Sequence, residues 1–204
     1  MNSKNRALTH TAILLLTFMA TSYAYSGKKD GFYKTHYADG TLKSEIFYRD
    51  GKKDGSHKLY NKDGTLLSEI RYTNNQKIYD KTQNQEGDTV ERWLKHSQVT
   101  HFKVYNKQGK LIEEGSYKDN LKHGIQKKFY PDGSIWIISP YAKGLKEGVE
   151  KQYYQTGQLQ LICQYKNGAR HGHSKTFDKE GTIKTEQVYI DGKLQRKKSN
   201  AHSP

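Results

Sequence analysis

The chain has 204 residues, of which 33% are hydrophobic and 16 are tyrosine, and its formal charge is +14. A chain this polar cannot bury a thick central core, which excludes an ordinary globular domain and favours repeated units that each bury one face against their neighbours. The aromatic content and the strict spacing described below exclude a disordered chain.

Residues 1–24 are predicted to be a signal peptide and not part of the fold. Lys4 and Arg6 precede the short apolar run Ala12–Ala20, and small residues near Ala24 fit a cleavage site. The run is too short for a comfortable membrane span, although a retained anchor is the alternative. Cleavage after Ala24 predicts an exported, periplasmic protein and, by removing Lys4 and Arg6, lowers the formal charge from +14 to +12.

A unit of 24 residues repeats through the rest of the chain and is clearest at Gly172–Gln195. Every regular copy has glycine at its tenth place, a branched aliphatic residue at its twelfth and tyrosine at its eighteenth. The regular copies begin at Gly31, Gly55, Thr100, Gly124, Gly148 and Gly172. Repetition at this period is typical of solenoids and arrays. We therefore predict an all-β, elongated, single-domain array of about seven stacked antiparallel β-hairpins.

Each copy is predicted to fold as two strands around a tight turn. If Gly64 has a left-handed backbone conformation and forms a bulge, Asn61 lies opposite Thr65. The next pair inward is then Tyr60 with Leu66. Such a pair contributes about 0.2–1 kcal/mol beyond alanine. A second turn follows each eighteenth-place tyrosine, and Gly or Asn at its last place favours a positive φ there. The same register predicts the pairs His36–Leu42, Tyr60–Leu66, Tyr105–Leu111, Phe129–Ile135, Tyr153–Leu159 and Phe177–Ile183.

The segment Tyr79–Val99 breaks the rhythm, because it has 21 residues. We interpret it as an irregular hairpin whose second strand is Val90–Leu94. The alternative is a protruding loop that presents Trp93 to a partner. With this unit included, the repeat domain is predicted to span residues 25–195, followed by a basic flexible tail at 196–204.

The pattern G-x-x-K-x-[YF]-x3-G-x-[LI]-x5-Y-x2-[GN] resembles the variant MORN repeat over about 165 residues, from Gly31 to Gln195. His36 in place of the aromatic residue and Thr100 in place of the opening glycine depart from the pattern. The repeats are similar to those of bacterial YwqK-type antitoxins. Some exported relatives act as immunity proteins that neutralise toxins in the periplasm, lipase-type toxins included. The resemblance therefore implies an array that binds a cognate toxin.

A lysine occupies the fourth place of every regular copy, and stacked hairpins would align these lysines roughly 9.5 Å apart. The ladder is a candidate track for an acidic partner or for lipid headgroups. In the alternative, each lysine stem packs along the aromatic residue two places later. Glutamates at the fifteenth place of four copies would partly neutralise the ladder. The candidate partner-binding residues are Arg92, Trp93, Trp136, Lys34, Lys58, Lys103, Lys127, Lys151 and Lys175, the first three because Arg and Trp are enriched at interface hot spots.

The sequence contains few residues in patterns typical of metal binding or catalysis. His171 and His173, with His123 one unit earlier, have no recognisable zinc spacing and suit a polar turn position. Cys163 is the single cysteine, so no disulfide forms within the chain, and we expect it to be a small buried hydrophobic residue. No motif of a hydrolase or nucleotide-binding enzyme is present. We expect no enzyme activity, no cofactor and no metal.

These observations together predict a periplasmic binding protein, monomeric, that neutralises a cognate toxin or another acidic protein by direct contact. Export argues against nucleic acid as the natural partner. One alternative is a peripheral protein on an anionic membrane surface. Another is an envelope structural protein whose ends self-associate.

Overall fold

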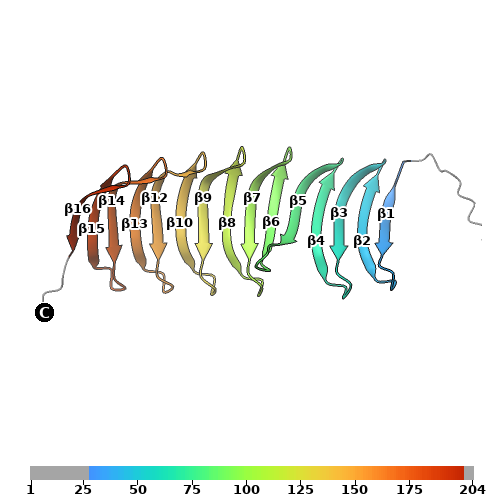
Figure 1. Ribbon diagram of the computed structural model, residues 1–204, viewed down its shortest axis with the longest axis horizontal. Helices are drawn as coiled ribbons and strands as arrows, with labels where there is room; N and C mark the ends of the chain where they lie inside the picture. The colour runs from blue at the N-terminus through green and yellow to red at the C-terminus, as the bar shows by residue number, and fades with distance from the viewer. Residues whose placement is uncertain (1–27, 200–204) are drawn as a thin grey trace, which may run out of the picture.

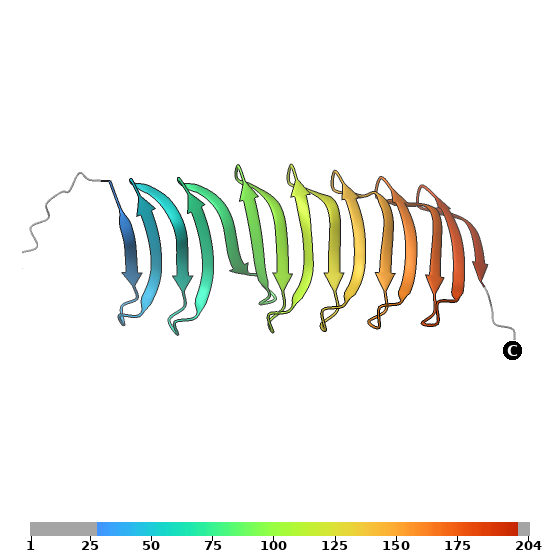
Figure 2. The same cartoon turned by 180° about the vertical axis from the view of Figure 1, so that it is seen from behind.

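The computed structural model describes residues 28–199, and the predicted signal peptide lies outside this range. Within it, every regular element is a β-strand, and the strands form one long antiparallel sheet (Figure 1). The strands follow one another in chain order, except that β11 pairs only with β10, and the view from behind shows the same uninterrupted row (Figure 2). The strands are β1 (Gly31–His36), β2 (Leu42–Arg49), β3 (Lys52–Tyr60), β4 (Leu66–Thr73), β5 (Gln76–Gln83), β6 (Thr89–Lys95), β7 (Gln98–Tyr105), β8 (Leu111–Lys118), β9 (Leu121–Phe129), β10 (Ile135–Ala142), β11 (Leu145–Lys146), β12 (Gly148–Tyr153), β13 (Leu159–Lys166), β14 (Ala169–Phe177), β15 (Ile183–Ile190) and β16 (Lys193–Ser199). The predicted hairpin array is confirmed.

The turn inside each hairpin has the predicted three-residue geometry. The Asn61 N–H donates to the Thr65 carbonyl at 2.9 Å, and the Gly64 N–H donates to the Asn61 carbonyl at 3.0 Å. Gly64 has φ +82°, and the next pair inward is Tyr60 with Leu66. All six predicted pairs are observed, because the same turn chemistry recurs in every regular copy.

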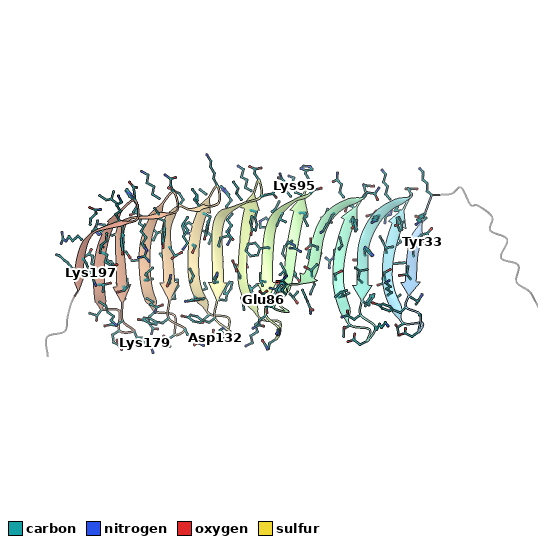
Figure 3. All side chains as sticks on the ribbon, in the orientation of Figure 1. Tyr33, Glu86, Lys95, Asp132, Lys179 and Lys197 are labelled. Carbon is teal, nitrogen blue, oxygen red and sulfur yellow. The ribbon has the colours of Figure 1, made fainter. Side chains whose placement is uncertain are left out.

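The turn between hairpins is as tight as the turn inside them. At Asp50-Gly51 both residues have positive φ, 51° and 79°, whereas the sequence analysis expected this only at the last place. Arg49 pairs directly with Lys52 across the turn. Such a two-residue turn matches the natural twist of the strands. Consecutive hairpins are therefore joined in one continuous ladder. The two kinds of turn lie along opposite long edges of the sheet, as the positions of Asp132 and Lys95 illustrate (Figure 3).

The opening glycine of the repeat lies at a wide bulge. Tyr48 pairs with Lys53, and the next pair in β2 and β3 is Ile46 with His57. Three residues of β3 therefore face a single residue of β2, and Gly55 is the middle one of the three with φ +89°. Glycine adopts this left-handed conformation without steric cost. The bulge explains the opening glycines Gly55, Gly124, Gly148 and Gly172. Gly31 lies on β1, which has no preceding strand among the described residues, but it has the same left-handed backbone with φ +85°.

Thr100 shows what happens where this glycine is missing. In β6 and β7, Leu94 pairs with Val99 and Trp93 pairs with His101, which leaves only Thr100 without an opposite residue. The bulge is shorter, but the two strands stay paired. The departure from the repeat pattern at Thr100 thus changes the local register and not the fold.

The irregular segment Tyr79–Val99 belongs to the sheet and does not protrude. β5 and β6 form a hairpin in which Tyr79 pairs with Trp93 and Asp80 with Arg92 (green in Figure 1). The last strand also differs from the sequence expectation, because β16 continues past residue 195 and pairs Lys198 with Glu186 of β15. The predicted tail therefore begins later than residue 196.

Tyrosine side chains connect strands at both edges of the sheet. At the three-residue turns, the Tyr154 hydroxyl donates to the Phe177 carbonyl of the next hairpin at 2.8 Å. At the edge with the two-residue turns, a cation on the first strand of a hairpin lies over the tyrosine ring of its second strand, as Lys53 of β3 does over Tyr72 of β4 at 5.1 Å. These contacts repeat along the array. They stabilise a thin fold that has no second layer among the described residues.

The two faces of the sheet differ. We call the side with the eighteenth-place tyrosines the tyrosine face and the side with the fourth-place lysines the ladder face. Cys163, 1% exposed and on the tyrosine face, is a small buried hydrophobic residue as predicted. Neighbouring side chains on the same face cover it, because Glu150 and Ser174 lie directly opposite it on the adjacent strands. The most buried polar side chains of the tyrosine face are Asp80, Gln126, Ser139, Glu150 and Ser174.

Candidate partner-binding surface

One row of side chains crosses the whole ladder face from β1 to β16. Each member lies directly opposite the next on the adjacent strand, so alternate members are roughly 9.5 Å apart. The row is Lys34, Glu45, Lys58, Glu69, Lys81, Glu91, Lys103, Glu114, Lys127, Ile138, Lys151, Ile162, Lys175, Glu186 and Lys198. It contains all six predicted ladder lysines. Lys81, Glu91 and Lys198 were missed, because the irregular unit and the last strand are out of step with the 24-residue frame.

Within the described residues, four of the eight lysines of the row form ion pairs with carboxylates, namely Lys58, Lys81, Lys127 and Lys175. Lys58 Nζ lies 3.5 Å from Glu45, and Lys127 Nζ lies 3.3 Å from Glu114. Lys175 makes a similar contact of 3.3 Å, with Glu186. The ammonium groups of these lysines therefore contact glutamates of the adjacent strand.

Two glutamates of the row, Glu69 and Glu186, have a lowered pKa that favours their charged form. Burial raises the pKa of the Glu69 carboxyl, but hydrogen bonds from Arg71 at 2.8 Å and Ser56 at 3.1 Å outweigh burial and hold that pKa below its ordinary value. The hydrogen bond from Lys175 likewise lowers the pKa of Glu186. At neutral pH the row is consequently an alternation of positive and negative charges.

This alternation is interrupted between β10 and β13. Ile138 and Ile162 occupy the places where four other copies have glutamate. Lys151 lies between them and is exposed, and within residues 28–199 its side chain makes no ion pair or hydrogen bond. We call the stretch from Lys127 through Ile138, Lys151 and Ile162 to Lys175 the ladder gap.

Exposed apolar side chains surround the ladder gap on the same face. Ile125 lies two residues before Lys127 on β9 and is 49% exposed, and Val149 lies two residues before Lys151 on β12 and is 42% exposed. Residues two apart on a strand share a face. Pro140 lies opposite Ile125 on β10. Lysine and apolar side chains therefore form one contiguous surface here.

Trp93 joins this surface, but the other two predicted aromatic or arginine sites do not. Trp93 lines a hollow of about 260 Å³ on the ladder face together with Lys103, Ile125 and Lys127. Its ring packs edge-on against Tyr79, with the ring centres 5.4 Å apart. This hollow borders the ladder gap, so Trp93 extends the surface toward β6.

Arg92 lies on the opposite face, since it precedes Trp93 in the same strand. Its guanidinium donates to Asp80 at 2.7 Å and to Thr82 at 3.1 Å, which makes it an internal partner of a buried carboxylate. Trp136 lies at a three-residue turn and packs against Tyr130, with the ring centres 5.8 Å apart. The structure therefore does not bring Arg92 and Trp136 together with Trp93.

A buried polar group on the tyrosine face was not anticipated from the sequence. Glu150 is 2% exposed and accepts hydrogen bonds from Lys146 and, at 2.6 Å, from Ser139. Burial raises the pKa of the Glu150 carboxyl, but these two contacts outweigh it and keep the pKa below its ordinary value. Lys146 also lies over the ring of Tyr165 at 4.7 Å. The buried carboxylate of Glu150 therefore has its hydrogen-bond partners within the protein, which favours a structural role for this group.

Within residues 28–199, two histidines lie close to carboxylates. His171 lies 3.2 Å from Asp191, and His173 lies 3.3 Å from Glu186. In this range no group of three or more His, Cys, Asp and Glu side chains is placed to hold a metal ion. Within the same limits, no helix has the length and apolar character that a membrane crossing requires.

Comparison with known proteins identifies the repeat. A family model described as MORN repeat variant matches residues 29–50, 53–74, 98–119, 122–143, 146–167 and 170–191. No curated protein matches the chain. Among solved structures, the chain is similar to a porin-like protein from Bacteroides uniformis, with 8% identity and a TM-score of 0.22 over 80% of this chain and 91% of that one. A similarity this weak carries no argument about fold or function.

Proposed function

This chain belongs to the MORN repeat variant family, and on this premise we propose that it is a binding protein of the immunity type, which neutralises a cognate toxin in the periplasm by direct contact. The toxin would be an acidic protein, for which a lipase-type effector is one model. The ladder face is the proposed binding surface.

The observation that carries this proposal is the charge balance of the ladder face. Within the described residues, the cross-sheet row holds eight lysines and five glutamates, an excess of three positive charges, two of which arise at the ladder gap, where Ile138 and Ile162 replace glutamate. The contact between Lys127 and Glu114 shows how the glutamates fix the positions of the lysines. A rigid, positively charged surface with an aromatic anchor such as Trp93 is suited to steer and hold an acidic partner.

The proposal is tested by affinity purification of the full exported protein from its own host. We expect one acidic protein to co-purify in a stable complex, and we expect the complex to protect cells that receive that protein. The affinity should fall as salt is raised, since exposed charges are screened over about 8 Å at physiological ionic strength. If no protein is captured and no toxin is neutralised, the proposal fails.

A matched pair of variants distinguishes the effect of the ladder lysines on partner binding from the effect of the net charge of the protein. In the first variant, Lys103, Lys127 and Lys151 are replaced by Gln. In the second, the exposed turn lysines Lys107, Lys110 and Lys179 are replaced by Gln, which removes the same charge from the turn edge. We expect only the first variant to lose the partner. Equal loss in both would show that overall charge, and not the ladder face, holds the complex.

The rival function is attachment to an anionic membrane. The glutamates of the row argue against it, because a flat bilayer must approach all of them together, whereas a protein can contact the lysines locally. Flotation with vesicles of anionic and of neutral lipids decides between them. If the protein binds anionic vesicles and this binding depends on Lys103, Lys127 and Lys151, the partner is a membrane surface and not a toxin.

A further inference from the structure

We propose that the ladder gap is the docking point for a short acidic segment of a protein partner, in which carboxylates and apolar side chains share one face. This inference deepens the proposed function and rests on it. It names the part of the ladder face that is used and the chemistry of the segment that occupies it.

Lys58 and Lys151 differ in the charges that lie opposite them on the adjacent strands. Lys58 has a glutamate directly opposite on each side, so its charge is largely compensated within the protein. Lys151 has Ile138 and Ile162 on its two sides and no carboxylate opposite. A carboxylate from outside can therefore take the place of the two missing glutamates at Lys151.

Exposed apolar side chains lie beside the lysines of the ladder gap. Ile125 and Val149 are 49% and 42% exposed, and they lie beside Lys127 and Lys151 on the same face. Exposed apolar side chains that adjoin one another are typical of interaction surfaces. An ion pair to Lys151 would be formed among apolar groups that exclude water, which strengthens it. The complementary segment must carry apolar side chains next to its carboxylates.

The ladder gap has a defined length. Lys127, Lys151 and Lys175 stand on β9, β12 and β14, and the ladder gap between the first and the last is roughly 19 Å long. About six residues of extended chain span this length. Glu114 and Glu186 close its two ends. These carboxylates would repel an anionic bilayer that covered the whole face, so a segment of protein is favoured over lipid.

The test restores the regular repeat. In the double variant Ile138→Glu and Ile162→Glu, the ladder gap receives the residue that other copies already have at this place, so the sheet should stay folded. The control is Gln85→Glu with Gln108→Glu, which adds the same charge at exposed turns. Circular dichroism and thermal melting check that both variants fold.

The probe is a short fluorescent peptide with the repeat Glu-Ser-Leu-Ser, in which glutamate and leucine lie two residues apart and share one face of an extended chain. Its binding to the full mature chain is measured by anisotropy. We expect the wild type and the control to bind it, the gap-filled variant to bind about tenfold or more weakly, and a peptide with glutamine in place of glutamate not to bind. A Lys151→Gln variant should show a smaller loss. Equal binding by the gap-filled variant and the control would overturn the inference.

The outcome is separable from that of the proposed function. If a toxin co-purifies equally with the gap-filled variant, the docking point is wrong while the proposed function stands. If the peptide binds in the ladder gap but no toxin is found, the docking point stands and the proposed function fails. Binding of anionic vesicles that is lost on gap filling, with no binding of the peptide, would overturn the assignment of a protein segment.

Discussion

Gly115 on β8 lies beneath the side chain of Gln126 on β9, and this contact allows a sharp test of the packing. Gln126 is 5% exposed, and its amide donates to the Ser116 carbonyl at 2.9 Å and to the His123 carbonyl at 3.3 Å. A Cβ atom at Gly115 would lie 1.8 Å from Gln126 Oε1. Gly115→Ala therefore forces the Gln126 side chain out of its place.

The expected cost follows from the two hydrogen bonds. Each contributes about 1 kcal/mol, and the loss of partners for the displaced amide costs about 1 kcal/mol more, the low end of the usual range, because the side chain is pushed toward solvent. Alanine recovers about 0.4–1 kcal/mol by restricting the unfolded chain, because Gly115 does not have a positive φ. We expect Gly115→Ala to lower the free energy of unfolding by about 2 kcal/mol.

The assay is urea denaturation of the wild type, Gly115→Ala, Gln126→Ala and the double variant. In the Gln126→Ala background the obstacle is gone, so we expect Gly115→Ala to be neutral or slightly stabilising there. The coupling between the two sites should thus be about 2 kcal/mol. If Gly115→Ala costs the same in both backgrounds, Gln126 does not occupy the space above Gly115 and the reasoning is refuted.

Three further predictions concern the repeat itself. Gly64→Ala should cost about 1 kcal/mol in urea denaturation through backbone strain alone, since Gly64 has φ +82° and a Cβ there meets nothing within 4 Å; no loss would contradict the turn geometry. Tyr154→Phe should cost about 1 kcal/mol by removing the hydrogen bond to the Phe177 carbonyl, and an unchanged urea midpoint would show that the bond contributes nothing. Burial and the charge of Lys53 lower the pKa of His57 below 6.5, so its neutral form favours the folded state and stability should decrease as pH falls below that value. His57→Gln should weaken this decrease, and equal urea midpoints for the wild type at high and low pH would count against it.

The hairpins were predictable from the sequence because their determinants are local. The turn at Asn61–Thr65 needs only a left-handed glycine and the residues beside it, and this fixes Tyr60 opposite Leu66 without reference to the rest of the chain. The ladder lysines followed from the same frame, since a constant period places equivalent residues in a row. The missing glutamates at Ile138 and Ile162 are also visible in the repeat, once the fifteenth place is compared between copies.

The composition of the binding surface depended on contacts between strands. Lys81 and Lys198 entered the ladder because the bulges of β5 and β16, which contain no glycine, are narrower than those of the regular copies and shift the pairing by one residue. Gln126 became buried only because Gly115 on the neighbouring strand leaves room for it.

The sequence by itself determined the repeat, the turns and the pairing within each hairpin, because these depend on a few neighbouring residues. Only the tertiary structure decided which side chains meet across hairpins. It placed Trp93 of β6 beside Lys103 of β7 and Lys127 of β9 on the ladder face. The physical reason is that the register between hairpins accumulates through every intervening bulge, so no single segment of the chain contains it.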